Sequence, residues 1–133
     1  MSADANTGTS TGLAANVAGL LTYILGPITG VLFLLLEKEN RFVRFHAMQS
    51  VVVGVAMIAL SVLLSIASSM LAFVPVIGWI VALLAGLALA VFSFVLWILL
   101  MVRAFQGKEW AVPLAGAYAR RFVTPSTAAP GIR

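Results

Sequence analysis

The sequence lacks cysteine and has few charged side chains: 9% of its 133 residues are Asp, Glu, Lys or Arg, and 62% are hydrophobic. Without cysteine the chain has no disulfide framework, no thiolate nucleophile and no cysteine-based metal site. Soluble domains are roughly 25% charged and 45–50% apolar, so this composition excludes a water-soluble fold. We therefore expect an integral membrane protein made of one domain.

Two long stretches without charge predict where the chain crosses the bilayer. Residues 13–36 carry no charge, and about 24 helical residues suffice to cross a hydrocarbon core of roughly 30 Å. Residues 47–102 carry none either, and as one helix they would measure on the order of 84 Å, so this stretch must fold back on itself. Pro75 and Gly78 are the turn-forming residues near its middle, and Trp79 is a typical interface anchor.

These patterns predict an all-α integral membrane protein with three transmembrane helices, the second and third joined by a tight hairpin. Gly26 and Pro27 predict a kink or an unwound stretch inside the first span. We expect a flexible segment before the membrane domain and a disordered tail after it. The expected bounds are residues 1–12 for the N-terminal segment, 13–122 for the membrane domain with spans at about 13–36, 47–72 and 79–102, and 123–133 for the tail.

The segment after the third span predicts a short amphipathic helix in the membrane interface, at about residues 113–122. Large apolar side chains recur there every four residues, and two arginines lie beside them. We expect the apolar stripe to lie in the interface while Arg120 and Arg121 face lipid headgroups. The stripe consists of Trp110, Leu114, Tyr118 and Phe122.

Residues 37–46 (EKENRFVRFH) form the one dense charge cluster before residue 103. Charge is costly in hydrocarbon, so this cluster predicts a surface loop, with Asn40 capping a helix that begins at Arg41. Basic residues gather in this loop and after the third span, while the N-terminal segment and the Pro75 turn have none. The positive-inside rule therefore places the loop and the C-terminus in the cytoplasm, and the N-terminus and the Pro75 turn outside a cytoplasmic or inner membrane.

Small residues recur along each span at steps of three or four, a pattern that lets helix backbones approach closely. They serve either packing within the three-helix bundle or docking onto another membrane protein, and three spans cannot bury every such stripe among themselves. The helix-packing candidates are Gly19, Gly26, Gly54, Ser61, Ser65, Ala82, Gly86 and Ala90.

His46, Gln49 and Ser50 share one helical face at the start of the second span. The face fits a structural hydrogen-bond network, a Ser-His dyad, or a ligand to a metal or pigment. Catalysis is disfavoured because the spans hold no acidic residue, and the same lack disfavours a proton relay or an ion-coupled transporter. The residues expected at the interface or at a partner are Arg41, Arg44, His46, Gln49, Trp110, Tyr118, Arg120 and Arg121.

Three motifs, EKENRFVRFHAMQS, PVIGW and GKEWAVPLAGAYA, resemble the small membrane-protein family known as domain of unknown function 4870 (DUF4870), which is grouped with Tic20-like proteins. The resemblance covers about residues 13–118 and implies a short, helical, membrane-embedded protein. Family members often carry an acidic residue after the glycine of the last motif, where this chain has Ala117. The relation to Tic20 implies a role in protein translocation, and no catalytic residues come with it.

Two functions follow as hypotheses. The first is a non-enzymatic accessory or scaffold subunit that packs against other integral membrane proteins, or against its own copies, in a larger complex. The alternative is a Tic20-like translocation or channel component, in which an oligomer would line a pore with Ser61, Ser65 and Ser68. We expect no cofactor, no metal and no small-molecule substrate. We also expect no nucleic acid, because the basic residues flank spans instead of forming one patch.

Overall fold

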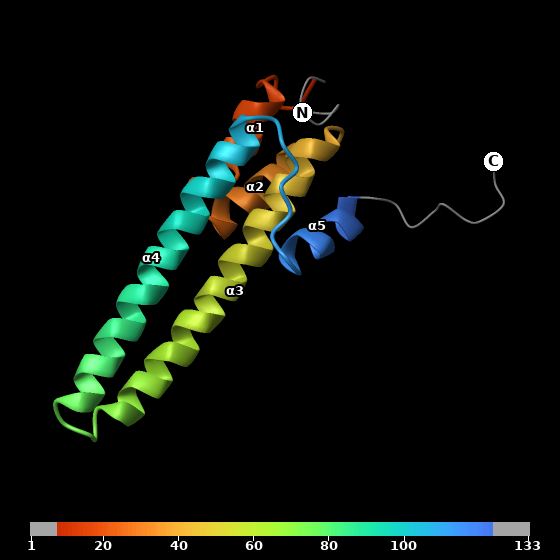
Figure 1. The fold of residues 1–133 in the computed structure, drawn as a ribbon. Helices are drawn as coiled ribbons and strands as arrows, with labels where there is room; N and C mark the ends of the chain where they lie inside the picture. Colours follow the sequence, from red (N-terminus) through yellow and green to blue (C-terminus); the bar gives the residue numbers. More distant parts are fainter. Residues whose placement is uncertain (1–7, 124–133) are drawn as a thin grey trace.

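The computed structural model describes residues 8–123, and these residues form five helices and no strand (Figure 1). The first seven residues and residues 124–133, where parts of the expected flexible segment and tail fall, lie outside the described residues. The helices are α1 (Ala15–Leu21), α2 (Pro27–Leu36), α3 (Arg41–Leu71), α4 (Ile77–Phe105) and α5 (Ala115–Val123).

A long hairpin of α3 and α4 forms the frame of the molecule (Figure 1). Among the described residues these are the two helices long and apolar enough to cross a membrane, with 31 and 29 residues. The Asn40 side chain accepts a hydrogen bond from Val43 N and caps α3, as predicted. The tight turn also lies where predicted: a Cβ at Gly78 would collide with the carbonyl oxygen of Leu71, so only glycine fits there.

The expected first span is not one helix, and the three-span prediction is not confirmed. The kink expected at Gly26 and Pro27 is a complete break between α1 and α2, because Gly26 adopts a left-handed φ of 58° and Pro27 starts a new helix. At 10 residues, α2 is about 15 Å long, too short to cross a bilayer alone.

The two short helices form a hairpin that starts and ends at the same end of the molecule. α2 runs antiparallel to α3: a Cβ at Gly54 would collide with Pro27, and one at Gly30 would lie 2.7 Å from the Ala47 carbonyl oxygen. Ser10, before α1, donates from its backbone nitrogen to a Glu37 carboxylate oxygen at 2.8 Å. The expectation that the N-terminal segment lies across the membrane from the 37–46 loop is therefore wrong.

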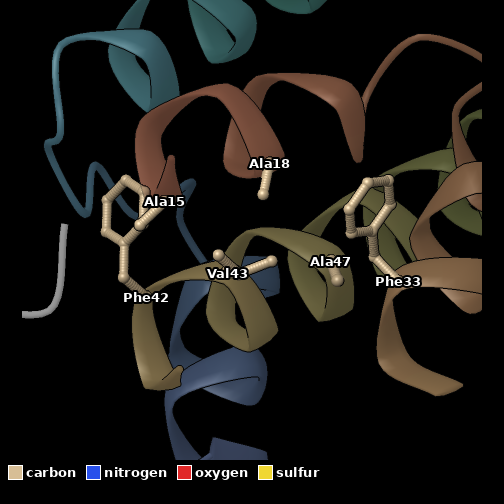
Figure 2. Packing of buried hydrophobic residues seen from close by; sticks show 6 residues of the cluster. All are labelled: Ala15, Ala18, Phe33, Phe42, Val43 and Ala47. Carbon is tan, nitrogen blue, oxygen red and sulfur yellow. The ribbon is translucent and has the colours of Figure 1, made fainter. Parts of the chain in front are cut away.

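Burial divides the molecule into two parts. We call residues 8–54 and 96–123 the head and residues 55–95 the distal hairpin. The short helices pack around the head end of α3 and α4, and one apolar cluster there joins α1, α2 and α3 (Figure 2). In the distal hairpin Gly78 is the one buried residue. The cluster consists of Ala15, Ala18, Phe33, Phe42, Val43 and Ala47.

The C-terminal helix α5 begins two residues later than expected and packs on α3. Its small residues Ala115, Gly116 and Ala119 are buried against the rest of the head. The neighbouring face carries the apolar stripe predicted from the sequence, whose members Leu114, Tyr118 and Phe122 are exposed. One face of α5 therefore meets protein and another remains open to its surroundings.

Candidate functional site

A network of buried polar side chains holds the break between α1 and α2 against α3. Ser50 Oγ lies 2.7 Å from Thr22 O and 2.8 Å from Gly26 O, which also accepts from Gly30 N, so the single hydroxyl proton of Ser50 is shared between the two carbonyls. Thr29 Oγ1 lies 2.9 and 3.2 Å from the same two carbonyl oxygens and likewise shares its single proton between them. Buried backbone groups need such partners, so these hydroxyls make the break possible.

The centre of the network is a chain of bonds from Tyr23 to α3. Tyr23 Oη lies 2.9 Å from His46 Nδ1, and Gln49 Nε2 donates to the same oxygen at 3.1 Å. On the other side of the tyrosine, Trp97 Nε1 donates to the Tyr23 carbonyl at 2.6 Å, which brings in α4. The two long helices α3 and α4 thus both bond a single residue of the α1–α2 break.

The bond partners fix the tautomer of His46. Its Nε2 lies 3.0 Å from the Lys108 carbonyl oxygen, which can only accept, so Nε2 carries the proton. In the neutral ring Nδ1 is then an acceptor and receives a hydrogen bond from the Tyr23 hydroxyl. Full burial of His46 favours the neutral imidazole, and both of its ring nitrogens are hydrogen-bonded, which leaves no lone pair for a metal or a pigment.

Gln49 ties the segment between α4 and α5 to α3. Its Nε2 donates to the Trp110 carbonyl at 3.0 Å, and its Oε1 accepts from Val112 N at 3.0 Å. These two bonds satisfy the backbone of an irregular segment inside the head. Within the described residues, every buried side-chain nitrogen or oxygen has a partner. The geometry is therefore that of a closed structural network.

The three residues expected on one face do come together, but not as a dyad. His46 bonds Tyr23 and Lys108, while the Ser50 hydroxyl points to the α1–α2 break. No bond joins the serine to the histidine, so the nucleophile-base geometry of a Ser-His dyad is not formed. His46 and Gln49 are both 0% exposed, so neither side chain reaches lipid or a partner.

A second polar junction lies where the N-terminal segment meets the 37–40 loop. The buried Glu37 carboxylate accepts from the Ser10 hydroxyl at 2.9 Å and from the backbone nitrogens of Ser10, Glu39 and Asn40 at 2.8, 3.1 and 2.9 Å. Burial raises the pKa of this carboxyl, but the hydrogen bonds outweigh burial and hold the pKa below its ordinary value. The ionised form locks the two segments together.

The small residues expected to pack helices fall into two groups. A Cβ at Gly19 would lie 2.9 Å from Phe42 Cε1, so this glycine serves contact inside the head, as does Gly54 against Pro27. Gly26 has no such contact and instead supplies the positive φ of the break. In the distal hairpin, a Cβ at Gly86 would meet nothing within 4 Å. The others there are half-buried or exposed: Ser61, Ser65, Ala82 and Ala90.

The remaining residues expected at the interface lie on the outside of the head. Arg44 and Trp110 are half-buried, and the rest are exposed. Cation-π contacts join α3 and α5: Arg44 Cζ lies 5.6 Å from the Phe122 ring centroid and Arg120 Cζ 5.7 Å from that of Phe45. The exposed members are Arg41, Tyr118, Arg120 and Arg121.

Sequence reasoning missed Tyr23 and Trp97 as members of the network. Each carries one polar atom on a large apolar body, and in an uncharged stretch that atom needs a protein partner. This signal could have singled out both residues, although it could not have paired them. Gly30 was missed as well, and a small residue facing Ala47 and Ser50 is what brings α2 close to α3.

Two membrane-length helices and a head closed by a buried polar network define a small membrane protein. The chain belongs to the Magnetosome magnetite crystal formation protein family, which it matches over residues 5–119. It is also similar to a protein named UPF0132 membrane protein from Methanocaldococcus jannaschii, with 40% identity over 86% of this chain and 93% of the relative.

A second relative with the name UPF0132 membrane protein, from Archaeoglobus fulgidus, is 40% identical over 80% of this chain and 92% of its own length. No solved structure matches the chain. These findings correct the resemblance drawn from the three sequence motifs: the family is the magnetosome one, and neither DUF4870 nor Tic20 is matched.

Proposed function

We propose that this protein is a non-enzymatic accessory or scaffold subunit that packs its distal hairpin against other membrane-embedded helices, including those of its own copies. The observation that carries the proposal is the contrast in burial: apart from Gly78, the distal hairpin buries none of its residues. Apart from Ser61, Ser65 and Ser69, its exposed side chains are apolar, and in a membrane their neighbours are lipid or other helices.

The chemistry of the distal hairpin suits contact between helices. Ser61, Ser65 and Ser69 each donate to the carbonyl four residues earlier, at 2.8 Å. Their hydroxyls are thereby satisfied within α3, and the three serines present a narrow face to the outside. In lipid, close backbone approach and interhelical hydrogen bonds supply association, at about 0.6–2 kcal/mol for each polar contact.

The proposed topology has two crossings, through α3 and α4, with the head at the cytoplasmic face. The head carries the cationic side chains that flank the hairpin, including Lys38, Arg44, Arg103 and Lys108, whereas the turn at residues 72–76 has no charge. By the positive-inside rule the turn then lies on the far side of the membrane. Both ends of the described chain lie with the head.

The test compares two substitutions that replace a small residue on an exposed face of the distal hairpin by a large one with a control substitution that keeps the size of the side chain. Gly86→Leu and Ser65→Leu should remove a slow-migrating complex seen by native electrophoresis of gently solubilised membranes, because each inserts a large side chain into a small-residue face. Leu87→Met is the matched control, since Leu87 is already large and 58% exposed. A wild-type protein that migrates as a monomer, or variants that assemble as it does, would refute the scaffold role.

The family match favours a second candidate, a role in the formation of magnetite crystals. Its test is complementation: the chain is expressed in a magnetite-forming bacterium whose own family member has been deleted, and crystal size is measured by electron microscopy. Restored crystals support this candidate, and crystals that stay as in the deletion strain exclude it for this chain. Gly86→Leu in the same assay would show whether hairpin packing is required.

A further inference from the structure

A groove with a mixed lining opens on the outside of the head, between the C-terminal end of α2 and the C-terminal end of α5. Its volume is about 600 Å³. Two cationic and four apolar side chains line it, and none of them is acidic. The lining residues are Leu34, Leu35, Lys38, Arg44, Phe122 and Val123.

We propose that this groove binds one anionic phospholipid, with the phosphate between Lys38 and Arg44 and the acyl chains against the apolar residues. Charge complementarity carries the choice of occupant. Lys38 lies between two carboxylates along the chain, but neither lines the groove: Glu37 is buried and accepts hydrogen bonds from Ser10 and Asn40, and Glu39 is exposed outside the lining. Basic pockets beside membrane helices are a recurrent form of headgroup site.

Arg44 is held in place before any ligand arrives. Its Nη1 donates to the Glu37 carbonyl at 2.9 Å and lies 3.5 Å from the Leu34 carbonyl oxygen, so the guanidinium caps the C-terminal end of α2. The Phe122 ring fixes its other side. The contacts with the Glu37 and Leu34 carbonyls both use Nη1 of Arg44, so the other N–H groups of the guanidinium remain for a phosphate. A group fixed in this way loses little entropy on binding.

The outer face of α2 supplies the path for an acyl chain. Leu35 is 68% exposed, and Ile28 at the start of the helix is 70% exposed. Val31 and Leu32 lie between them and are also exposed, so an apolar strip about 10 Å long leads from the groove along α2. A soluble phosphate compound would leave this strip uncovered, which is why the proposal commits to a phospholipid.

The experiment measures lipids retained by the full-length protein in native mass spectrometry, with phosphatidylglycerol and phosphatidylcholine of identical acyl chains. The wild type should bind the first phosphatidylglycerol at least several-fold more tightly than phosphatidylcholine. Lys38→Gln should weaken phosphatidylglycerol binding about fivefold, the effect of one basic residue near a membrane surface. Lys108→Gln, which removes an exposed head lysine away from the groove, should leave it unchanged.

Two further arms distinguish a phospholipid site from a site for soluble anions. Leu35→Asn should weaken the binding of both lipids, because it interrupts the apolar strip, and circular dichroism shows whether the fold is kept. Inorganic phosphate at millimolar concentration should not displace phosphatidylglycerol. Equal losses in Lys38→Gln and Lys108→Gln, equal binding of the two lipids, or displacement by phosphate would each overturn the proposal.

Discussion

The helices α3 and α4 run through both the head and the distal hairpin, but their small and polar side chains make different contacts in the two regions. In the head, Ser50 donates its hydroxyl to carbonyls of another segment, whereas in the distal hairpin Ser61 and Ser65 donate to their own helix. Glycines differ in the same way: Gly54 in the head is pressed against Pro27, and Gly86 in the distal hairpin meets nothing.

The difference teaches that the same residue types can close one part of a membrane protein and leave another open. In the head, small and hydroxylated residues make contacts with other segments of the chain, and these contacts build the fold. In the distal hairpin Ser61 and Ser65 bond only their own helix and Gly86 meets nothing, so these residues remain available to neighbours. Substitutions in the head should therefore lower stability, whereas substitutions in the distal hairpin should weaken assembly with other helices.

The largest expected effect is all-or-none and concerns which side of the membrane each region faces. Because the chain has no cysteine, single cysteines give no background. With an impermeant thiol reagent applied to intact cells, Val76→Cys at the hairpin turn should be labelled, while Ser10→Cys and Lys38→Cys should not. All three should react after permeabilisation. Labelling of Ser10→Cys without Lys38→Cys would show that the two residues lie on opposite sides.

Next in size is the contrast between glycines of the two regions. Gly54→Leu should lower the free energy of unfolding by about 3 kcal/mol, because the side chain would overlap Pro27 in a packed contact. Gly86→Leu should change it by less than about 0.5 kcal/mol, since nothing lies within reach of its Cβ. Thermal unfolding in detergent measures both. Equal losses would mean that the distal hairpin is packed as tightly as the head.

A smaller effect tests the polar network. Tyr23→Phe removes the hydroxyl that joins His46 to Gln49. Because a buried polar atom of each side chain then loses a hydrogen-bond partner, the free energy of unfolding should fall by about 1–3 kcal/mol. Tyr118→Phe is the matched control on α5, where the side chain is 59% exposed, and should have little effect. Amide hydrogen exchange should show faster opening of residues 106–112 in Tyr23→Phe alone.

The smallest effect concerns pH and the Glu37 junction. Since the folded state lowers the pKa of Glu37, ionisation stabilises the head above the ordinary carboxyl pKa of 4.5, and this stability is lost as the pH falls through the folded pKa. Thermal unfolding of wild type below pH 4.5 should therefore approach that of Glu37→Gln. Glu39→Gln, at an exposed side chain, is the control. A Glu37→Gln effect that is constant down to pH 2 would contradict the assignment.

Hydropathy and turn chemistry predicted the α3–α4 hairpin, the Asn40 cap and the helical fold, because these depend on neighbouring residues. The α1–α2 hairpin could not be predicted by counting charges, since residues 13–36 are apolar whether or not the helix is continuous. What turns the chain back is the left-handed Gly26 together with long-range contacts, such as Pro27 against Gly54.

The candidate site was predicted only in part, for the same reason. Periodicity placed His46, Gln49 and Ser50 on one face of α3. It could not supply their partners, because Tyr23 lies 23 residues from His46 and the Trp110 carbonyl lies 61 residues from Gln49. The Ser-His hypothesis failed because side chains on one face need not bond one another when the backbone of other segments competes for them.

Because α3 is one unbroken helix, its tilt in the membrane depends on the thickness of the bilayer. From Phe45 to Leu71 the helix carries no charge and is about 40 Å long, whereas a typical hydrocarbon layer is roughly 30 Å thick. A helix longer than the layer tilts, or thickens the bilayer around it. A thicker membrane lets α3 stand more upright, and a thinner one makes it lean, which changes the angle at which α3 meets neighbouring helices.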